Sequence, residues 1–290
     1  MQIGILSVAH QSYSTRRLSE AAQQRGHHVV LLNTLKCHLQ IASSAPTVYH
    51  EAQPVCALDI IIPRIGASIT FYGTTILRQF EMMGVRALNT ADAINRARNK
   101  LHALQLFSQH NIALPTSTFA HQLEDFYHIL PSLKMPHLIK PIIGTQGKNI
   151  QLAHDVSAAR DLVNATTMRK KKFFMQEFIA LDEISDIRCF VIGKKIVASI
   201  KRQAKAGEFR ANLHCGGTAS LIELTPQEHA LALQVVEILG LSIAGVDMLR
   251  TPQGPVILEV NASPGLEGIE DISGVDIAGE IVAYGEKFPI

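Results

Sequence analysis

The stretch GVDMLRTPQGPVILEVNASPG most constrains the fold, because it is typical of two β-strands joined by a tight turn. With Pro252, Gln253 and Gly254 as three loop residues, proline fits the first helical φ and glycine the left-handed third position. This register predicts that Asp247 lies directly across from Glu259 on the neighbouring strand. Two carboxylates are therefore expected to oppose each other in one sheet.

The same hairpin predicts a metal site. Side chains along a strand alternate between faces, so Glu259 and Asn261 share a face with Asp247. Opposed carboxylates repel each other, and a divalent cation removes that repulsion. Magnesium prefers a few carboxylate or carbonyl oxygens completed by phosphate oxygens and water, which indicates a Mg²⁺–nucleotide site.

The alternative for this hairpin is a solvated polar face of an antiparallel strand pair. The neighbouring residues favour the metal site, because apolar side chains on the opposite face indicate a sheet packed on one side. The acids would then face a cleft or water. The apolar residues in question are Val246, Met248, Leu258 and Val260.

The first third of the chain predicts a small α/β domain. Apolar runs at 3–8 and 29–32 flank a polar, helix-like stretch, and a third run at 58–62 precedes a loop and a helix stopped by Gly84. No GxGxxG motif follows the first strand, so the dinucleotide-binding fingerprint is absent. A nucleotide must be bound elsewhere in the chain.

The middle and last parts alternate predicted helices and strands. Residues 91–110 have a helical pattern, and 111–115 end it. A small α+β unit is then expected, with the strand-like HLIKPII and IQLA flanking the motif GTQG and a helix following from 156 to about 166. Further strands are predicted at 173–179, 187–191, 196–201, 244–249 and 256–260, and a further helix at 226–239.

The GTQG motif, Gly144 to Gly147, lies between two strands, and Lys148 is followed by Asn149 rather than by Ser or Thr. Both features exclude a Walker A loop. A glycine-rich hairpin can still offer backbone N–H groups to phosphates and close over a nucleotide as a lid. The alternative is an ordinary turn.

Basic side chains near this motif are candidate phosphate ligands. Lys140 ends the strand before the loop, and Lys100 lies in the preceding helical stretch, although a single lysine is usually a solvated surface residue. The run IKRQAKAGEFRANLHCGG adds enough positive charge to hold a triphosphate, an acyl phosphate or an acidic substrate. Its cations are Lys201, Arg202, Lys205 and Arg210.

Length and composition bound the class of protein. A chain of 290 residues predicts about two domains, and 47% hydrophobic with 18% charged residues is typical of a soluble globular protein. A net charge of +2 does not demand a nucleic-acid partner. No apolar run is long enough to span a membrane. The separated Cys37, Cys56, Cys189 and Cys215 predict neither zinc nor disulfides, which fits a cytoplasmic protein.

Beyond these patterns, the chain resembles the ATP-grasp ligases, specifically the RimK group, which adds glutamate to the C-terminus of the sixth small-subunit ribosomal protein. The resemblance covers nearly the whole chain. The motifs that carry it are ILS, PRIG, ITFYGT, LRQFEM, ARxKL around Lys100, GTQG, QEFI, DIRCFVIG, RANLHxGG, AGVD and EVNASPGLEGIE.

The resemblance implies an α/β (α+β) ATP-grasp fold. It places an N-terminal, Rossmann-like pre-ATP-grasp domain at 1–95 and the ATP-grasp domain at 104–286. The latter comprises a central lid subdomain at about 104–175 and a C-terminal metal-binding subdomain at 176–286. ATP would lie between the last two.

The resemblance also implies residue roles. Lys100 and Lys140 would contact ATP phosphates, with Arg210 as a catalytic cation, and Glu177 and Phe178 would lie along the adenine. The metal ligands would be Asp247, Glu259 and Asn261. The full implied nucleotide-binding set is Lys100, Lys140, Gly144, Gly147, Glu177, Phe178, Asp186, Arg210, Ala211 and Asn212.

The implied reaction transfers the γ-phosphoryl group of ATP to a carboxylate, and the amino group of glutamate then attacks the acyl phosphate. It implies ATP, two magnesium ions replaceable by manganese, L-glutamate and a ribosomal protein as ligands and partners, with a homo-oligomeric enzyme and no requirement for nucleic acid or membrane. Two departures concern the substrate: Lys148 and Asn149 replace Ile and Gly of the usual GTQGIGV, and Cys215 replaces the arginine of HRGG.

Two alternatives stay open. The first is a ligase of the same group that acts on a small cofactor, poly-glutamate or a carrier protein. The second is a nucleotide-binding regulator without catalysis. A regulator would be expected to have a damaged metal triad, whereas Asp247, Glu259 and Asn261 are all present.

Overall fold

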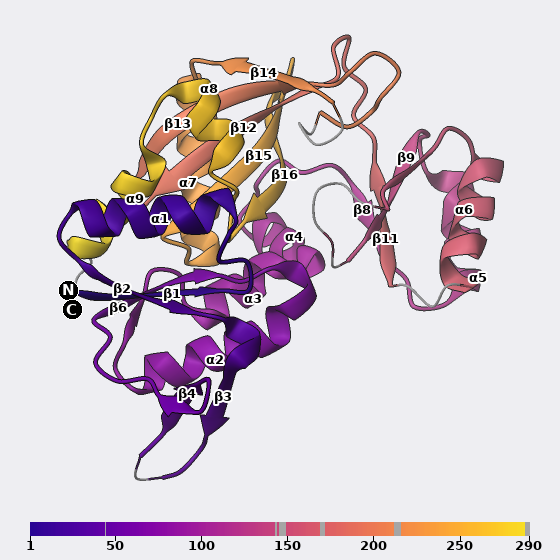
Figure 1. The fold of residues 1–290 in the computed structure, drawn as a ribbon. Helices are drawn as coiled ribbons and strands as arrows, with labels where there is room; N and C mark the ends of the chain where they lie inside the picture. The colour runs from indigo at the N-terminus through magenta and orange to yellow at the C-terminus, as the bar shows by residue number, and fades with distance from the viewer. Residues whose placement is uncertain (44, 143, 145–148, 169–171, 212–215, 288–290) are drawn as a thin grey trace.

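Three lobes make up the computed structural model, which describes the chain apart from residues 44, 143, 145–148, 169–171, 212–215 and 288–290. A parallel sheet with helices forms the first lobe, a small α+β unit the second, and a larger antiparallel sheet with helices the third (Figure 1). Helices and sheets are thus mixed, as the sequence predicted. None of the described helices is long and apolar enough to cross a bilayer.

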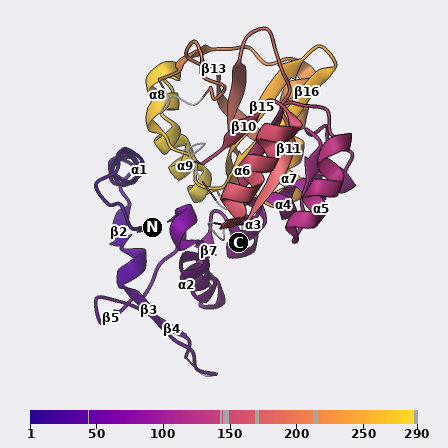
Figure 2. The same ribbon diagram turned by 90° about the vertical axis from the view of Figure 1, so that its right-hand side faces the viewer.

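The first lobe is built on a parallel sheet in the order β2-β1-β6-β7. The predicted βαβ beginning is confirmed: β1 (Gln2–Ser7) leads through α1 (Tyr13–Gln24) into β2 (His28–Leu32). An antiparallel hairpin that the sequence did not predict extends away from the lobe (Figure 2). The other elements of the lobe are η1 (Thr34–Lys36), β3 (Cys37–Gln40), β4 (Thr47–His50), β5 (Gln53–Pro54), β6 (Ile60–Arg64), η2 (Ala67–Ile69), α2 (Thr70–Met82) and β7 (Arg86–Ala87).

The helical pattern predicted over 91–110 is confirmed, but it forms two helices, α3 (Ala91–Arg98) and α4 (Lys100–Gln109). Asn99 separates them with φ −85° and ψ 95°, which are not helical angles. Its side-chain oxygen accepts a hydrogen bond from the His102 backbone N–H at 3.2 Å and so caps α4. Lys100 is therefore the first residue of a helix rather than an interior one.

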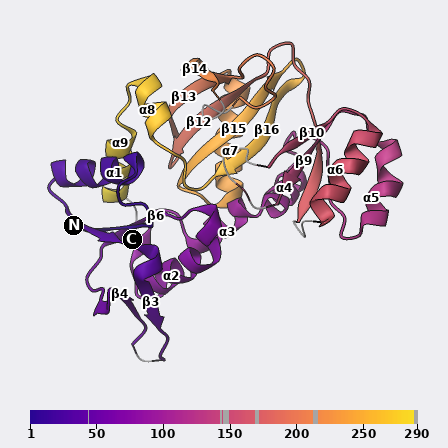
Figure 3. The same cartoon turned by 45° about the vertical axis from the view of Figure 1, so that its right-hand side comes forward.

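The second lobe has its own hydrophobic core. Its sheet runs β10-β9-β11-β8, and Figure 3 shows α5 and α6 covering the outer side of that sheet, away from the rest of the chain. The elements are β8 (Ser117–Thr118), α5 (Leu123–Ile129), η3 (Leu130–Ser132), β9 (His137–Pro141), β10 (Gln151–Ala153), α6 (Val156–Met168) and β11 (Phe173–Glu177). The core residues are Phe126, Leu130, Ile139, Ala153, Ala159, Val163, Phe173 and Met175.

The third lobe carries the sheet β14-β13-β12-β15-β16, in which all neighbouring strands are antiparallel. Its predicted helix is confirmed as α7 (Pro226–Leu239). Thr225 and Glu228 form a capping box at its start, and Gly240 closes it with φ +68°. The other elements are β12 (Ser185–Ile192), β13 (Lys195–Gln203), β14 (Thr218–Leu221), β15 (Ile243–Thr251), β16 (Gly254–Asn261), α8 (Glu267–Ser273) and α9 (Ile277–Glu286).

The predicted pairing of Asp247 with Glu259 is confirmed, but the predicted three-residue loop is wrong. Thr251 pairs with Gly254, so the turn has two residues, and Gly254 keeps a positive φ of 117°. A β-bulge at Leu258 inserts one unpaired residue and restores the expected register. Leu258 consequently lines a cavity instead of joining the packed face, where Ile257 is buried.

The last helix joins the third lobe to the first. Side by side, α1 and α9 cover the parallel sheet (Figure 1). Ile3 and Ile5 of β1 belong to one buried cluster with Ile281 and Val282 of α9. The first and third lobes therefore share a core, whereas the second lobe does not take part in it.

Candidate active site

A cavity of about 830 Å³ opens where the three lobes meet. Ser7 from the first lobe, Lys140 from the second and Asp247 from the third all line it. Its size suits a nucleotide-sized ligand.

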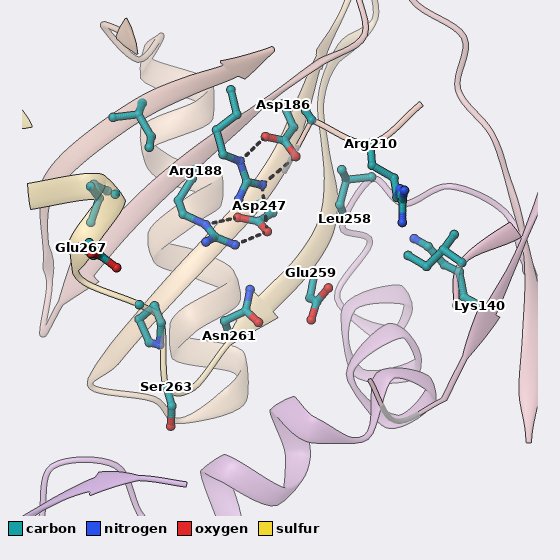
Figure 4. A pocket seen from close by; sticks show the side chains of 18 of the residues that line it. Lys140, Asp186, Arg188, Arg210, Asp247, Leu258, Glu259, Asn261, Ser263 and Glu267 are labelled. Atoms are coloured by element: carbon teal, nitrogen blue, oxygen red, sulfur yellow. Dashed lines mark hydrogen bonds and ion pairs between the residues drawn. The ribbon is translucent and has the colours of Figure 1, made fainter. Parts of the chain in front are cut away.

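The predicted metal ligands converge on this cavity, since Asp247, Glu259 and Asn261 all line it. Figure 4 shows Glu259 and Asn261 projecting from β16, with Asp247 behind them on β15. Two carboxylates and one amide oxygen thus lie on one face of the sheet, as the alternation of side chains predicted.

A buried ion network supports the acidic face (Figure 4). Arg188 donates from Nε and Nη2 to the two Asp247 oxygens, at 2.7 and 2.6 Å. Arg202 donates in the same bidentate way to Asp186, at 2.6 and 2.7 Å, and its Nη2 lies 3.1 Å from Asp247 Oδ2. Two arginines and two aspartates therefore alternate beneath the cavity.

The two aspartates of this network differ in acidity. Burial alone would raise the pKa of Asp247, but the Arg188 and Arg202 guanidiniums outweigh it and hold that pKa below its ordinary value. For Asp186, burial outweighs the attraction of Arg202, and the nearby Asp247 charge adds to it, so the pKa is raised. The two guanidiniums therefore favour the ionised form of Asp247, which is the form that can bind a cation.

The residues present fit a magnesium ion. An ionised carboxylate offers about four lone pairs, and Asp247 accepts one hydrogen bond from Arg188 on each oxygen, with Arg202 Nη2 a further 3.1 Å from Oδ2, so the carboxylate keeps capacity to bind a cation. Within the described residues no group of three or more His, Cys, Asp or Glu side chains could hold a metal by itself. The two carboxylates Asp247 and Glu259, with the amide of Asn261, match the way magnesium is usually held, by one or two carboxylates plus phosphate oxygens and water.

Two lysines bring positive charge to the acidic face. Lys100 Nζ lies 3.6 Å from Glu259 Oε2. Lys140 donates from Nζ to Gln176 Oε1 at 2.5 Å, which fixes its direction. Burial, with the Lys100 charge as a second cause, lowers the pKa of Lys140 to about 8. Lys140 lines the cavity, whereas Lys100 lines a small pocket beside it, which it shares with Lys140 and Glu259.

Comparison with known proteins decides the family. Residues 97–284 match the RimK-like ATP-grasp domain, and residues 1–94 match the RimK PreATP-grasp domain. The chain belongs to the RimK-like ATP-grasp family. The resemblance of the sequence motifs is thus confirmed, as are the predicted fold and the prediction of an ATP-dependent ligase.

Relatives in sequence and solved structures of the same fold both match nearly the whole chain. A probable alpha-L-glutamate ligase of Hydrogenovibrio crunogenus is 51% identical over 99% of this chain and 96% of its own length. The RimK domain protein ATP-grasp from Sphaerobacter thermophilus superposes with a TM-score of 0.76 at 21% identity, covering 98% of this chain and 99% of that one. The ATP-grasp ligase PsnB, complexed with minimal precursor, Mg and ADP, gives 0.73 at 15% identity, with 98% of both chains covered.

The structure brings most of the predicted nucleotide residues of the ATP-grasp domain to one cavity. Glu177 and Phe178, which follow one another at the end of β11, line it with Asp186, Arg210 and Ala211. Gly144, although described, is not among the lining residues. Gly147 and Asn212 lie outside the described residues, as do the departures at Lys148 and Cys215.

The basic run before residue 217 does not act as one cluster. Arg202 is 3% exposed and paired with the aspartates, and Lys201 pairs with Glu183 at 2.5 Å on the exposed side. Arg210 lines the cavity and donates to Glu208, with an Nη2 to Oε2 distance of 2.7 Å. Of the four predicted cations, Arg202 and Arg210 line the cavity, and Lys201 and Lys205 do not.

Arg188 is a residue of the candidate site that the sequence motifs did not single out. It lies on β12, directly across from Asp247 on β15, and α7 separates the two strands in sequence. The DIRC segment contains it, but only the order of the strands reveals the partner. A strand pairing between non-consecutive strands would have been needed to find it.

Proposed function

We propose that this chain is an ATP-dependent α-L-glutamate ligase that joins the amino group of glutamate to an acceptor carboxylate, the C-terminus of the sixth small-subunit ribosomal protein. The observation that carries the proposal is the acidic face of Asp247, Glu259 and Asn261 opposite Lys140 in one cavity. The names of the relatives, such as probable alpha-L-glutamate ligase, support the amino-acid substrate.

Asp247, Glu259 and Asn261 would hold two magnesium ions, or manganese in their place. The ions would neutralise charge on the bound phosphates. A complex of PsnB with Mg and ADP supports this use of the fold. Arg188 and Arg202 would keep the Asp247 carboxylate oriented and ionised.

The cationic residues would position ATP. Lys100, Lys140 and Arg210 would meet the phosphates, and Glu177 with Phe178 would lie along the adenine between the second and third lobes. Arg210 points into the cavity toward Lys140 (Figure 4). Such fixed cations stabilise charge that develops during phosphoryl transfer.

The reaction needs no protein nucleophile. An oxygen of the acceptor carboxylate attacks the γ-phosphorus, so a C–O–P linkage forms and ADP leaves. The uncharged amine of glutamate then attacks the carbonyl carbon. A C–N bond forms, the C–O bond to phosphate breaks, and the amine loses one proton as inorganic phosphate departs.

The lobes suggest a division of labour. The first lobe, 1–95, and the ATP-grasp part, 104–286, would be two domains joined by the core that they share, with 104–175 as a lid over the nucleotide. The independent core of the second lobe supports this role. The enzyme would act in the cytoplasm as a homo-oligomer, with no need of nucleic acid or membrane.

The decisive experiment measures ADP release by purified protein with ATP and Mg²⁺, with and without glutamate and the ribosomal protein, while the acceptor mass is followed in parallel. Glutamate-sized mass increments that depend on both substrates are the expected result. If ADP release needs glutamate but the ribosomal protein keeps its mass, the ligase chemistry stands and the acceptor is a small cofactor, poly-glutamate or a carrier protein. No ADP release under any combination would leave the non-catalytic regulator.

Glu259→Gln provides a matched test of the metal assignment. The substitution removes one charge from the acidic face without changing its shape, so turnover should fall to background while the protein still folds. Glu183→Gln, at an exposed carboxylate paired with Lys201, should keep full activity. Unchanged turnover in Glu259→Gln would contradict the assignment.

A further inference from the structure

The carboxyl-terminal edge of the parallel sheet opens into the same cavity, opposite the acidic face. From β1 the chain crosses to β2 on one side, while β6 lies on the other side, so the strand order changes direction between β1 and β6. Ser7 and Arg64, paired at the ends of these two strands, both line the cavity. Open α/β sheets bind ligands at such a switch point.

Two arginines stand at this edge without carboxylate partners. Among the described residues no acidic oxygen lies within 4.0 Å of either Arg64 or Arg98. Instead, Arg64 Nη2 donates to the Pro264 carbonyl at 2.7 Å, and Arg98 Nη2 donates to the Ile65 carbonyl at 2.6 Å. These hydrogen bonds orient both side chains without neutralising their positive charges.

Burial makes the unpaired charge costly. It lowers the pKa of Arg64 to about 10, with the Arg98 charge as a further cause, and it lowers the pKa of Arg98 as well. Arg98 Nε is buried and has no hydrogen-bond partner within the described part of the chain. Two like charges in one half-buried corner are stabilised by an anion.

The surrounding groups also favour an anion. The N-terminal turn of α1 lines the cavity beside the arginines and contains no acidic residue, so its positive dipole end is not neutralised. Ser263 Oγ is buried and, among described residues, lacks a partner. Gly66 leaves open space, because a Cβ built on it would meet nothing within 4 Å.

We propose that Arg64 and Arg98 form a subsite for a carboxylate of the free amino-acid substrate. The proposal rests on the ligase function, and it assigns the substrate to the wall that the first lobe contributes. A guanidinium binds carboxylates through paired N–H donors, which suits this recognition.

The chemistry favours the free amino acid over the other anions of the reaction. The acceptor carboxylate reacts with the γ-phosphate and so must lie at the acidic face, and the ATP phosphates meet Lys100, Lys140 and Arg210. Glutamate instead brings two carboxylates that must bind without reacting. Arg98 and Glu259 line the same cavity, so an amino acid held by Arg98 can direct its amine toward an acyl group at the acidic face.

The test combines enzyme variants with substrate analogues. KM is measured for glutamate, for glutamine and for glutamic acid α-amide with wild type, Arg64→Gln, Arg98→Gln and Arg98→Lys. One of the two half-amides should have a KM roughly 10- to 100-fold above that of glutamate in wild type, and it identifies the bound carboxylate. In Arg64→Gln and Arg98→Gln the KM for glutamate itself should rise by that factor. The KM for the half-amide should then be little higher than the KM for glutamate in the same variant. Arg98→Lys should recover part of it.

Two controls separate recognition from folding. Arg78→Gln removes an exposed arginine that pairs with Asp92 and does not line the cavity, so it should behave as wild type. The KM for ATP should stay the same in every variant. Equal losses for the half-amides in wild type and variants would overturn the proposal, as would a raised KM for the acceptor with an unchanged KM for glutamate.

A binding measurement keeps this proposal distinct from the ligase function. Glutamate is titrated into protein with Mg²⁺ and ADP and followed by calorimetry. If wild type binds glutamate, Arg98→Gln weakens that binding, and neither protein turns glutamate over, the subsite is supported and the proposed ligase function is overturned. If wild type neither binds glutamate nor turns it over, both fall.

Discussion

Replacement of Arg202 by methionine should destabilise the protein severely. The Arg202 side chain is 3% exposed, donates bidentately to Asp186 and lies 3.1 Å from Asp247 Oδ2. The substitution leaves the buried Asp186 carboxylate without its partner, while Asp247 keeps Arg188. Removing one member of a buried pair costs about 3–5 kcal/mol, because an uncompensated charge stays behind.

Thermal unfolding followed by circular dichroism measures this loss. A loss of 1 kcal/mol lowers the Tm of a large domain by about 2–4 °C, so the Tm of Arg202→Met should fall by roughly 6–20 °C. Lys201→Met is the matched control. Lys201, the neighbour of Arg202, forms an exposed pair with Glu183, so its replacement should cost at most about 1 kcal/mol.

A double variant tests the cause. Arg202→Met with Asp186→Leu removes both charges, and buried pairs replaced by apolar residues are often neutral or stabilising. The double variant should therefore recover most of the lost Tm. The reasoning is refuted if the single variant unfolds within about 2 °C of wild type, or if the double variant is no more stable than the single one.

Three further predictions use groups elsewhere in the chain. Lys140 loses its proton as pH rises past about 8, so the KM for ATP should rise about 10-fold per pH unit above that point. In Lys140→Arg the KM for ATP should stay constant between pH 7 and 9.5, because arginine keeps its charge. The same pH dependence of KM in both proteins would contradict a role for the Lys140 charge. The hydrogen bond from Arg25 and that from His27 lower the pKa of Glu286 to about 2. The ionised Glu286 carboxylate therefore stabilises the folded protein above its unfolded pKa, and this stabilisation is lost as pH falls toward 2. Glu286→Gln should accordingly lower the Tm at pH 7, and its gap to wild type should narrow between pH 5 and 3; a constant gap would argue against the ion pair. Thr225→Ala breaks the capping box of α7 and should cost about 1 kcal/mol in urea unfolding, while no change would show that packing alone holds that helix end.

Local patterns explain how much of the site was predictable. Asp247 and Glu259 are twelve residues apart in one hairpin, so alternation and turn chemistry were enough to place them opposite each other. The bulge at Leu258 was not readable, because any apolar residue fits either face. It moved one expected core residue into the cavity without disturbing the acids.

Long-range pairing explains what could not be predicted. Arg188 meets Asp247 through the pairing of β12 with β15, which are not consecutive in the chain, and nothing local distinguishes Arg188 from a solvated cation. Arg202 instead meets Asp186 across the hairpin of β12 and β13. Arg64 and Arg98 come together because a strand end and a helix end meet at the cavity. Helix α7 was predicted with its observed bounds because proline, a capping box and a terminal glycine mark both of its ends.

The shared core of β1 and α9 has a consequence for how the protein folds during its synthesis on the ribosome. The chain is made from residue 1 onward, so the apolar face that Ile3, Leu18 and Ile60 present is complete long before its partners Ile281 and Val282 exist. That face stays uncovered while more than two hundred further residues are translated. A nascent chain stalled before residue 277 should remain bound to chaperones, and the released full-length chain, in which α9 can pack, should not.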